Sequence, residues 1–380
     1  MRIGIDARFY GPLGKGLGRY TQKLIENLQK IDTQNEYYIF LRQENWDEFR
    51  PYNPNFHKVL ADYRWYTLAE QIFFPAKILR LRLDLMHFPH FNVPFLYYRE
   101  FVVTIHDLIL TKFPTMRATT LGPWLYKMKY WGYRIIILSA VRRAKKVITV
   151  SEFVKKELIN QFKLPTEKVI VTYEAADVVE SGQLKIPDKD LTRYGIKQKY
   201  LLYVGNAYPH KNLEGLLRVF KILKTENNFD YQLVLVGKED YFYDRLKAEA
   251  RAAGLLEEKN GLAPVIFFGF SSQEMLADLY RNATLYVFPS FYEGFGLPPL
   301  EAMSYGLPVT ASNSTCLPEI LGEAAIYFDP KNTEEIAARI KEVLSNNDLR
   351  QKLIKLGFDQ VKKYNWGKCA QATLIIYQNA

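Results

Sequence analysis

Cysteine is almost absent from this chain. Its 380 residues include only two, Cys316 and Cys369, which lie far apart in the sequence. Two distant thiols form neither a disulfide framework nor a metal-binding cluster. We therefore expect a reducing, cytoplasmic environment and no metal site.

Long hydrophobic runs are also lacking. No stretch of about 18 uncharged apolar residues occurs, so we expect no transmembrane helix. The longest candidate, 135–141, is closely flanked by Arg134 and Arg142. The apolar run after Met1 is too short for a signal peptide and reads as a first strand.

Acidic residues are missing from one long segment. No Asp or Glu occurs from Leu108 to Ser151, and this segment accounts for most of the chain's net charge of +10. Such a basic stretch favours an anionic partner: nucleic acid, phosphate or an anionic membrane. No recognition motif accompanies the charge, so we expect no nucleic-acid partner. The segment carries nine cations: Lys112, Arg117, Lys127, Lys129, Arg134, Arg142, Arg143, Lys145 and Lys146.

Short apolar runs alternate with helical patterns along the whole chain, whose hydrophobic content is 48%. Continuous apolar strands between helices predict parallel sheets that are buried on both faces. The fold class is therefore α/β, with two doubly wound domains. We expect domains at 1–180 and 191–365, with 366–380 as an amphipathic C-terminal helix. The expected strands are 3–5, 37–41, 101–105, 147–150 and 169–172, then 201–204, 232–236, 265–268, 285–288 and 308–311.

One constellation follows the predicted strand that ends at Phe288. Glu293 precedes a glycine-containing loop, and Glu301 lies one turn into the helix that Pro298 and Pro299 open. Backbone amides and the helix dipole at such a position attract phosphate. The carboxylates can accept hydrogen bonds from sugar or ribose hydroxyls. The simpler interpretation is a tight strand–helix turn with two solvated acids.

Three further features also follow predicted strands. In Gly205–Asn212, Lys211 could neutralise a diphosphate beside a helix that Asn212 caps. The glycines Gly14, Gly16 and Gly18 open another helix without matching a dinucleotide or Walker fingerprint. His106 ends a strand at the edge where α/β proteins bind ligands. The alternatives are a surface lysine, a flexible glycine hairpin and a structural histidine.

Together these motifs resemble the retaining family 4 glycosyltransferases along essentially the whole chain. The specific motif is the pair Glu293 and Glu301, separated by seven residues; the Gly16–Tyr20 opening, His106-Asp107, Val150–Phe153 and the Gly205–Asn212 loop support it. The resemblance implies a GT-B architecture: two Rossmann-like domains facing across a cleft, with the helix from Trp366 crossing back to the first.

The resemblance also implies roles for individual residues. Glu293 would contact the donor sugar, Glu301 the ribose, and Lys211 the departing diphosphate. His106 would lie near the reacting sugar, so the expected catalytic residues are His106, Lys211 and Glu293. The expected donor-binding residues are Gly16, Ser151, Gly205, Asn206, Lys211, Gly294, Phe295, Gly296, Leu297 and Glu301. Many members place an Arg shortly before the Lys; here Asn206 follows Gly205 and His210 precedes Lys211, which leaves a second cation unassigned.

The implied reaction is transfer of a hexose from a nucleotide-diphosphate sugar without metal or other cofactor. Loop amides and Lys211 would stabilise the negative charge on the departing phosphate. That phosphate could itself take the acceptor's proton. GDP-mannose is the preferred donor, and the expected acceptor is a free or lipid-linked saccharide of surface polysaccharide or glycolipid synthesis. The alternatives are a sugar-nucleotide epimerase and a non-catalytic, membrane-associated scaffold that binds nucleotide sugars.

The basic segment also predicts a helix over 121–146. Spacing places Trp124, Lys127, Trp131 and Arg134 on one face, and 121, 125, 128, 132 and 135 on another. The first face could lie on an anionic membrane, at the inner side of the cell membrane. It could instead bind the acceptor, or the helix could pack an apolar face and expose a solvated basic one.

Overall fold

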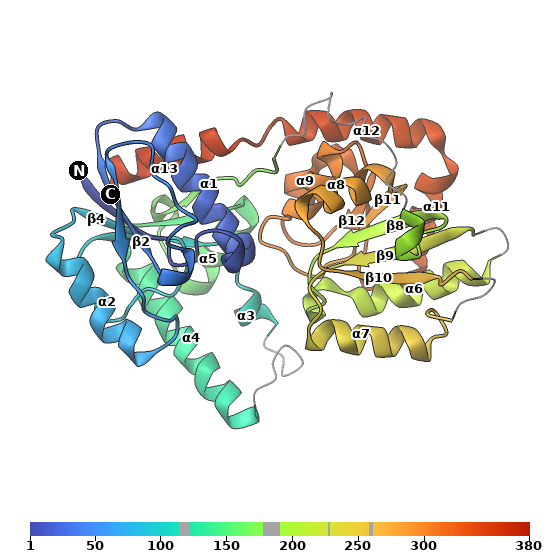
Figure 1. The fold of residues 1–380 in the computed structure, drawn as a ribbon, viewed down its shortest axis with the longest axis horizontal. Helices are drawn as coiled ribbons and strands as arrows, with labels where there is room; N and C mark the ends of the chain where they lie inside the picture. Colours follow the sequence, from blue (N-terminus) through green and yellow to red (C-terminus); the bar gives the residue numbers. More distant parts are fainter. Residues whose placement is uncertain (114–121, 178–190, 227–228, 258–260) are drawn as a thin grey trace. The chain divides into compact units, whose positions relative to one another are not determined.

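The computed structural model describes residues 1–113, 122–177, 191–226, 229–257 and 261–380 (Figure 1). They divide into two compact units, which are described separately here. Unit 1 is Met1–Glu174 with Asn365–Ala380, and unit 2 is Ala175–Tyr364. Among the described residues no helix is long and apolar enough to cross a membrane.

Unit 1 is built on a seven-stranded sheet in the order β3-β2-β1-β4-β5-β6-β7. Every neighbouring pair is parallel, and β1, β4 and β5 are buried almost throughout. The strands are β1 (Arg2–Asp6), β2 (Glu36–Leu41), β3 (Phe56–Leu60), β4 (Leu85–Phe88), β5 (Phe101–Ile105), β6 (Lys146–Thr149) and β7 (Val169–Val171).

Helices cover both faces of this sheet. On one face, α2 (Leu68–Arg80), α4 (Pro123–Arg143) and α5 (Glu152–Phe162) share one hydrophobic core with Met86 and Phe88 of β4. His87 lies between those residues and therefore points to the opposite face. There it contacts Tyr377 of α13 (Trp366–Gln378), which packs against α1 (Lys15–Ile31). The short helix α3 (Ile109–Lys112) follows β5.

The C-terminal helix therefore belongs to unit 1, as expected from the sequence. Asn365 caps α13 by accepting hydrogen bonds from the N–H groups of Gly367 (2.7 Å) and Lys368 (3.2 Å). Near the other end, the Tyr377 hydroxyl lies 2.6 Å from Nδ1 of His87. The helix is thus fixed at both ends.

Unit 2 repeats the same design with a six-stranded parallel sheet in the order β10-β9-β8-β11-β12-β13. The predicted α/β fold with two doubly wound domains is confirmed. The strands are β8 (Lys199–Val204), β9 (Tyr231–Val236), β10 (Val265–Gly269), β11 (Leu285–Phe288), β12 (Val309–Ser312) and β13 (Ala325–Phe328). The helices are α6 (Leu213–Thr225), α7 (Tyr241–Ala252), α8 (Gln273–Asn282), α9 (Leu297–Ser304), α10 (Leu317–Leu321), α11 (Thr333–Ser345) and α12 (Asn347–Val361).

In each sheet the chain order reverses at one point, between β1 and β4 in unit 1 and between β8 and β11 in unit 2. Loops that leave the carboxyl ends of two such strands diverge to opposite faces of the sheet. Open α/β sheets bind ligands in the crevice that this divergence leaves. In unit 2 the loops at this point carry Lys211 and Glu293, whereas in unit 1 His106 and Ser151 follow β5 and β6 instead.

Candidate functional site

The best-defined candidate site lies on the loops that follow β8 and β11 in unit 2. Nζ of Lys211 donates hydrogen bonds to both carboxylate oxygens of Glu293, at 2.7 and 2.8 Å. The two side chains are only 14% and 9% exposed, and the ring of Phe288 lies 5.8 Å from Nζ. The sequence identified both residues on separate motifs but did not predict that they form an ion pair.

Backbone and amide hydrogen bonds join the same two loops. Phe291 N–H donates to the carbonyl of His210 at 2.7 Å. The amide of Asn212 donates to the carbonyls of Pro289 (3.1 Å) and Pro330 (2.8 Å). Asn212 is the N-cap residue of α6 as predicted, but its side chain makes no capping hydrogen bond and its backbone is left-handed, with φ of 58°. Its amide instead ties the β8 loop to the loop after β11.

Glycines let the two loops fold tightly. Gly205 ends β8 with its N–H bonded to the carbonyl of Val236, and an added Cβ would lie 2.7 Å from the Tyr203 hydroxyl. Gly296 has φ of +96° directly before α9, and its Cβ would lie 2.8 Å from a methyl group of Leu317. Both positions therefore disfavour any side chain.

Asn206 shapes the β8 loop rather than supplying charge. Its Oδ1 accepts a hydrogen bond from Tyr208 N–H at 3.3 Å, and its carbonyl accepts one from the Tyr203 hydroxyl at 3.0 Å. A neutral amide engaged in this way does not replace the second cation that the resemblance implies.

Thr315 and Cys316, which sequence reasoning missed, hold the Glu293 loop from the next strand. The Thr315 hydroxyl accepts a hydrogen bond from Glu293 N–H at 3.1 Å. The buried Cys316 thiol donates to the carbonyls of Glu293 and Phe295, both at 3.3 Å. In the sequence both residues follow the predicted strand 308–311, but the position of that strand beside β11 is a property of the folded sheet.

The rest of the predicted donor site lies along the same loop. Gly294, Phe295 and Gly296 are buried, Leu297 is half-buried, and the Phe295 ring packs edge-on against Tyr364 with centroids 5.5 Å apart. Glu301 lies in the second turn of α9, where Oε2 accepts a hydrogen bond from the Tyr280 hydroxyl at 3.3 Å. In unit 2, Lys211, Glu293 and the loop amides thus lie on the loops that follow the adjacent strands β8 and β11, and Glu301 lies in the helix after the second loop.

In unit 1, both ring nitrogens of His106 are occupied. Nδ1 lies 2.9 Å from Oε1 of Glu174, and Nε2 lies 3.0 Å from the carbonyl of Pro89. A carboxylate and a carbonyl both accept hydrogen bonds, so these two partners suit the protonated ring, which has an N–H on each nitrogen. Burial lowers the pKa of His106, but the hydrogen bond and charge of Glu174 raise it further, and the net shift is upward. Glu174 was not predicted from sequence.

The other expected residues of unit 1 are Gly16 and Ser151. Gly16 lies in the first turn of α1, is exposed, and has open space where a Cβ would be. Gly14 and Gly18 differ, because a Cβ there would lie 2.0 Å from the Phe9 carbonyl and 2.1 Å from the Gly11 carbonyl. Ser151 is buried and caps α5 by accepting a hydrogen bond from Val154 N–H at 3.3 Å.

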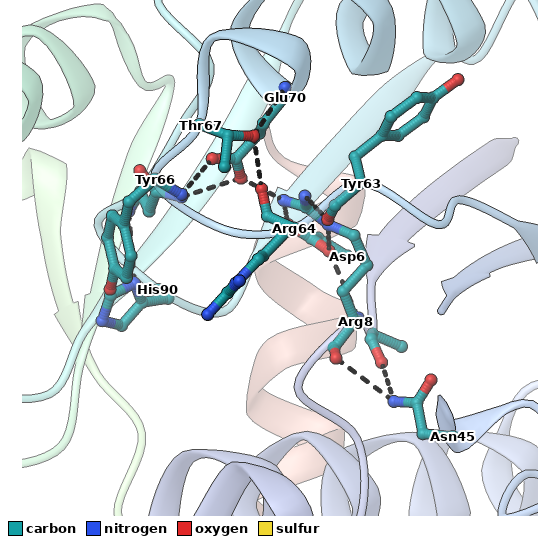
Figure 2. Close-up of polar contacts among 11 residues, drawn as sticks. Asp6, Arg8, Asn45, Tyr63, Arg64, Tyr66, Thr67, Glu70 and His90 are labelled. Carbon is teal, nitrogen blue, oxygen red and sulfur yellow. Dashed lines mark hydrogen bonds and ion pairs between the residues drawn. The ribbon is translucent and has the colours of Figure 1, made fainter. Parts of the chain in front are cut away.

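A buried charge network lies at the order reversal of unit 1 (Figure 2). Arg8 is wholly buried after β1 and donates to Asp6 Oδ2 (2.7 Å) and Glu70 Oε1 (2.8 Å). Glu70 also accepts from the N–H of Tyr66 at 2.7 Å. Tyr66 is 61% exposed with φ of 62°, and its ring lies 6.4 Å from that of His90. The network thus fixes the loop before α2, which presents an exposed tyrosine.

Helix α4 exposes the four residues that the sequence singled out: Trp124, Lys127, Trp131 and Arg134. The exposed fractions are 83% for Trp124 and 63% for Trp131. The grouping of positions 128 and 135 on a separate face is wrong, because Met128 and Ile135 are also exposed and continue the tryptophan stripe. The helix packs instead through Tyr133, Ile137, Ala140 and Val141.

Among the described residues, no three His, Cys, Asp or Glu side chains are grouped closely enough to hold a metal ion.

Comparisons with known proteins bear on the whole chain. Residues 14–180 match the family described as Glycosyltransferase Family 4, and residues 189–360 match Glycosyl transferases group 1. The O-antigen chain mannosyltransferase B of Escherichia coli is 30% identical over 381 residues, covering 96% of each chain. The O-antigen chain mannosyltransferase RfbU of Salmonella typhimurium is 27% identical, covering 73% of this chain and 71% of the relative.

Two solved structures share the fold over essentially their full lengths. Sucrose-phosphate synthase from Thermosynechococcus elongatus has a TM-score of 0.74 at 21% identity, covering 100% of this chain and 98% of the other. HepE of Anabaena, in complex with UDP-glucose, has a TM-score of 0.73 at 16% identity and full coverage of both chains. At such low identity these likenesses show the fold alone.

Proposed function

Because the chain belongs to the family 4 glycosyltransferases and has two Rossmann-like domains of the GT-B kind, we propose that it is a retaining hexosyltransferase that uses a nucleotide-diphosphate sugar. The observation that carries this proposal is the ion pair of Lys211 and Glu293 at the order reversal of the second sheet. It combines a cation for a diphosphate with a carboxylate for sugar hydroxyls.

Lys211 and Glu293 can serve the donor without separating. An ionised carboxylate has about four lone-pair sites, so a Glu293 that accepts two hydrogen bonds from Lys211 can still accept from hydroxyls. Lys211 has three N–H donors, of which Glu293 uses two. The third, with the amides of Gly294 to Leu297 at the start of α9, would stabilise the charge on the departing diphosphate. In this scheme the glycosyl–phosphate bond breaks, the acceptor oxygen bonds to the anomeric carbon, and the departing phosphate oxygen takes the acceptor's proton.

We propose GDP-mannose as the donor, because the relatives include O-antigen chain mannosyltransferases. The UDP-glucose complex of HepE supports a nucleotide sugar in general. The acceptor would then be a lipid-linked saccharide of surface polysaccharide or glycolipid synthesis. We propose that the protein works in the cytoplasm at the inner face of the cell membrane, without a metal or other cofactor.

The first test measures thermal stability with GDP-, UDP- and ADP-sugars. A selective donor stabilises the fold by mass action, so GDP-mannose should raise the melting temperature more than its UDP and ADP counterparts. A larger shift with a UDP-sugar would overturn the choice of donor. No shift with any sugar nucleotide would contradict the donor site itself.

The second test uses variants of the ion pair. Lys211→Ala and Glu293→Ala should each abolish the donor-induced shift or reduce transfer by about 100-fold or more, the scale of losing one charge-stabilising group. Lys341→Ala is the matched control, because Lys341 forms an exposed ion pair of similar length with Glu226 in the same unit. It should leave both readouts unchanged. Full activity in Glu293→Ala would show that the site assignment is wrong.

Product analysis separates the rival functions. Incubation with the sugar nucleotide alone would yield an isomer if the protein were an epimerase. Calorimetric donor binding without turnover across an acceptor panel would indicate a scaffold. Transfer with retained anomeric configuration, measured by NMR of the product, would support the proposal; an inverted product would contradict the retaining mechanism.

A further inference from the structure

Exposed large apolar side chains are concentrated on unit 1. The described residues include 22 such side chains, of which four belong to unit 2, leaving 18 on unit 1. Three segments supply ten of them. They are Leu68, Ile72 and Phe73 of α2, Phe95, Leu96 and Tyr98 of the β4–β5 loop, and Trp124, Met128, Trp131 and Ile135 of α4. Exposed apolar groups gathered in this way indicate an interaction surface.

On α4 the four exposed side chains form one continuous stripe. Positions 124, 128, 131 and 135 are spaced by four, three and four residues, which places them on one side of a helix. The exposed cations Lys127 and Arg134 border this stripe. Figure 1 shows the first turns of α4 extending away from the rest of unit 1. An apolar stripe edged by cations, with two tryptophans, is the pattern of helices that lie in a membrane interface.

Hydrogen bonds connect the three segments into one surface. Phe95 N–H donates to Oε1 of Gln71 on α2 at 2.8 Å. The Phe95 carbonyl accepts from Nη1 of Arg143, in the last turn of α4, at 2.9 Å. The Phe95 backbone therefore bridges the two helices, and both also pack into the same hydrophobic core. We call the exposed side chains of α2, the 94–99 loop and α4 the docking surface.

The docking surface carries charge of one sign only. Residues 68–80, 94–99 and 122–143 contain eight Lys and Arg residues and a single acid, Glu70. The exposed Glu100 directly after the loop is paired with Lys145. Glu70 is wholly buried and paired with Arg8, so it contributes no exposed negative charge. A second copy of this chain would bring the same positive charge against itself, which disfavours self-association through this face. An anionic bilayer offers both the apolar layer and the opposite charge.

We propose that the docking surface binds the interface of a bilayer that contains anionic lipid, with Trp124 and Trp131 at headgroup depth and α2 and the 94–99 loop as a second area of contact. The inference extends the membrane contact beyond the α4 residues that the sequence indicated. It rests on the membrane location proposed above but not on donor binding or catalysis, so failure of vesicle binding and failure of the transferase proposal are distinguishable.

The test is flotation of the full chain with vesicles of phosphatidylcholine, with and without phosphatidylglycerol, in the absence of any sugar nucleotide. Binding should require phosphatidylglycerol and weaken at high salt. Lys127→Gln and Arg134→Gln should each weaken binding about fivefold, the effect of one cation near an anionic surface. Trp131→Ser and Ile72→Ser should each weaken it further, by removing apolar contact from α4 and α2 respectively.

The matched control is Phe270→Ser, because Phe270 is 82% exposed but belongs to unit 2. It should float like the wild type, and circular dichroism should show that all variants are folded. Equal binding to vesicles without phosphatidylglycerol, or no binding to either, would overturn the proposal. An effect of Trp131→Ser with none for Ile72→Ser would limit the contact to α4 and refute the composite surface. Dimers in light scattering that Trp131→Ser abolishes would identify a second copy as the occupant instead.

Discussion

Thr315 is held in a backbone conformation that suits a threonine poorly. Its φ is 60°, which crowds a β-branched side chain and costs about 1–3 kcal/mol. The conformation is nevertheless the one in which its hydroxyl accepts the hydrogen bond from Glu293 N–H. Strain of this kind persists where the surrounding structure enforces it, and it is often found at functional sites. We infer that Thr315 positions Glu293 and thereby the ion pair with Lys211.

Substitution of Thr315 separates stability from function. Thr315→Gly removes both the hydroxyl and the strain, so the free energy of unfolding should stay level or rise while the donor-induced thermal shift falls. Thr315→Ala should lose the donor shift and gain no stability, because alanine keeps a Cβ at positive φ. Thr225→Ala is the control, since its hydroxyl also bonds to backbone but lies at the end of α6. An unchanged donor shift in Thr315→Gly would show that the hydroxyl does not position the site.

At the scale of elements, the sequence predicts most strands of both sheets. Every predicted strand is present, including the edge strands β7 and β10, but the expected strands omit the central β4 and the edge strands β3 and β13. Residues of an edge strand are less buried, and β3 carries His57 and Lys58 side by side, which interrupts its apolar run. A parallel strand that is buried on both faces has a continuous apolar run, and this run is the feature by which the sequence predicts it.

The same limit explains what was found and missed in the site. Lys211 and Glu293 each follow a central strand that its apolar run predicts, so both residues were identified from the sequence. Their pairing depends on β8 and β11 being neighbours although the two residues are 82 positions apart. Thr315 reaches Glu293 only because β12 lies beside β11. Strand order is set by packing of the whole sheet, and no local pattern contains it.

The loop between β3 and α2 depends on the buried Arg8 network (Figure 2). Arg8→Met should destabilise unit 1 by about 3–5 kcal/mol, because it leaves the carboxylates of Asp6 and Glu70 buried without their partner. Adding Glu70→Gln should recover part of this loss, since one buried charge is then removed. Denaturant unfolding measures both. Lys145→Met, which breaks the exposed pair with Glu100, is the control and should change little. Equal effects of Arg8→Met and Lys145→Met would contradict a buried network.

At the scale of the whole molecule, four of the five histidines have shifted pKa values, and the shifts have opposite directions. The hydrogen bond and charge of Glu174 outweigh burial and raise the pKa of His106. Burial and nearby positive charge lower the pKa of His87 and His90 to about 3 and that of His210 to about 4, so these three are neutral. His87 shows how neutrality is used: its two nitrogens bond to the hydroxyls of Tyr377 and Thr104, which can donate or accept.

These shifts predict how stability depends on pH. In the unfolded chain His87, His90 and His210 take up protons as the pH falls through about 6.5, but in the fold they resist until about 3 to 4. Stability should therefore fall below about pH 6.5, by up to about 1.4 kcal/mol per pH unit for each histidine. His106 has the opposite sign: its contribution is complete below its unfolded pKa and is lost only as the pH rises through its raised folded pKa.

His87→Gln provides the sharpest test of this dependence, because a glutamine side chain can still donate and accept but does not titrate. Its cost in stability should be largest at pH 7 and shrink between pH 6.5 and 4, as the wild type loses the stability that a neutral His87 maintains. Denaturant unfolding at three or more pH values in this range measures the change, with His57→Gln as the control because His57 is exposed on an edge strand. A pH-independent difference between His87→Gln and wild type would show that His87 titrates alike in both states. The buried link between β4 and α13 would then tolerate a charged ring, and acid sensitivity would have to come from elsewhere in the two units.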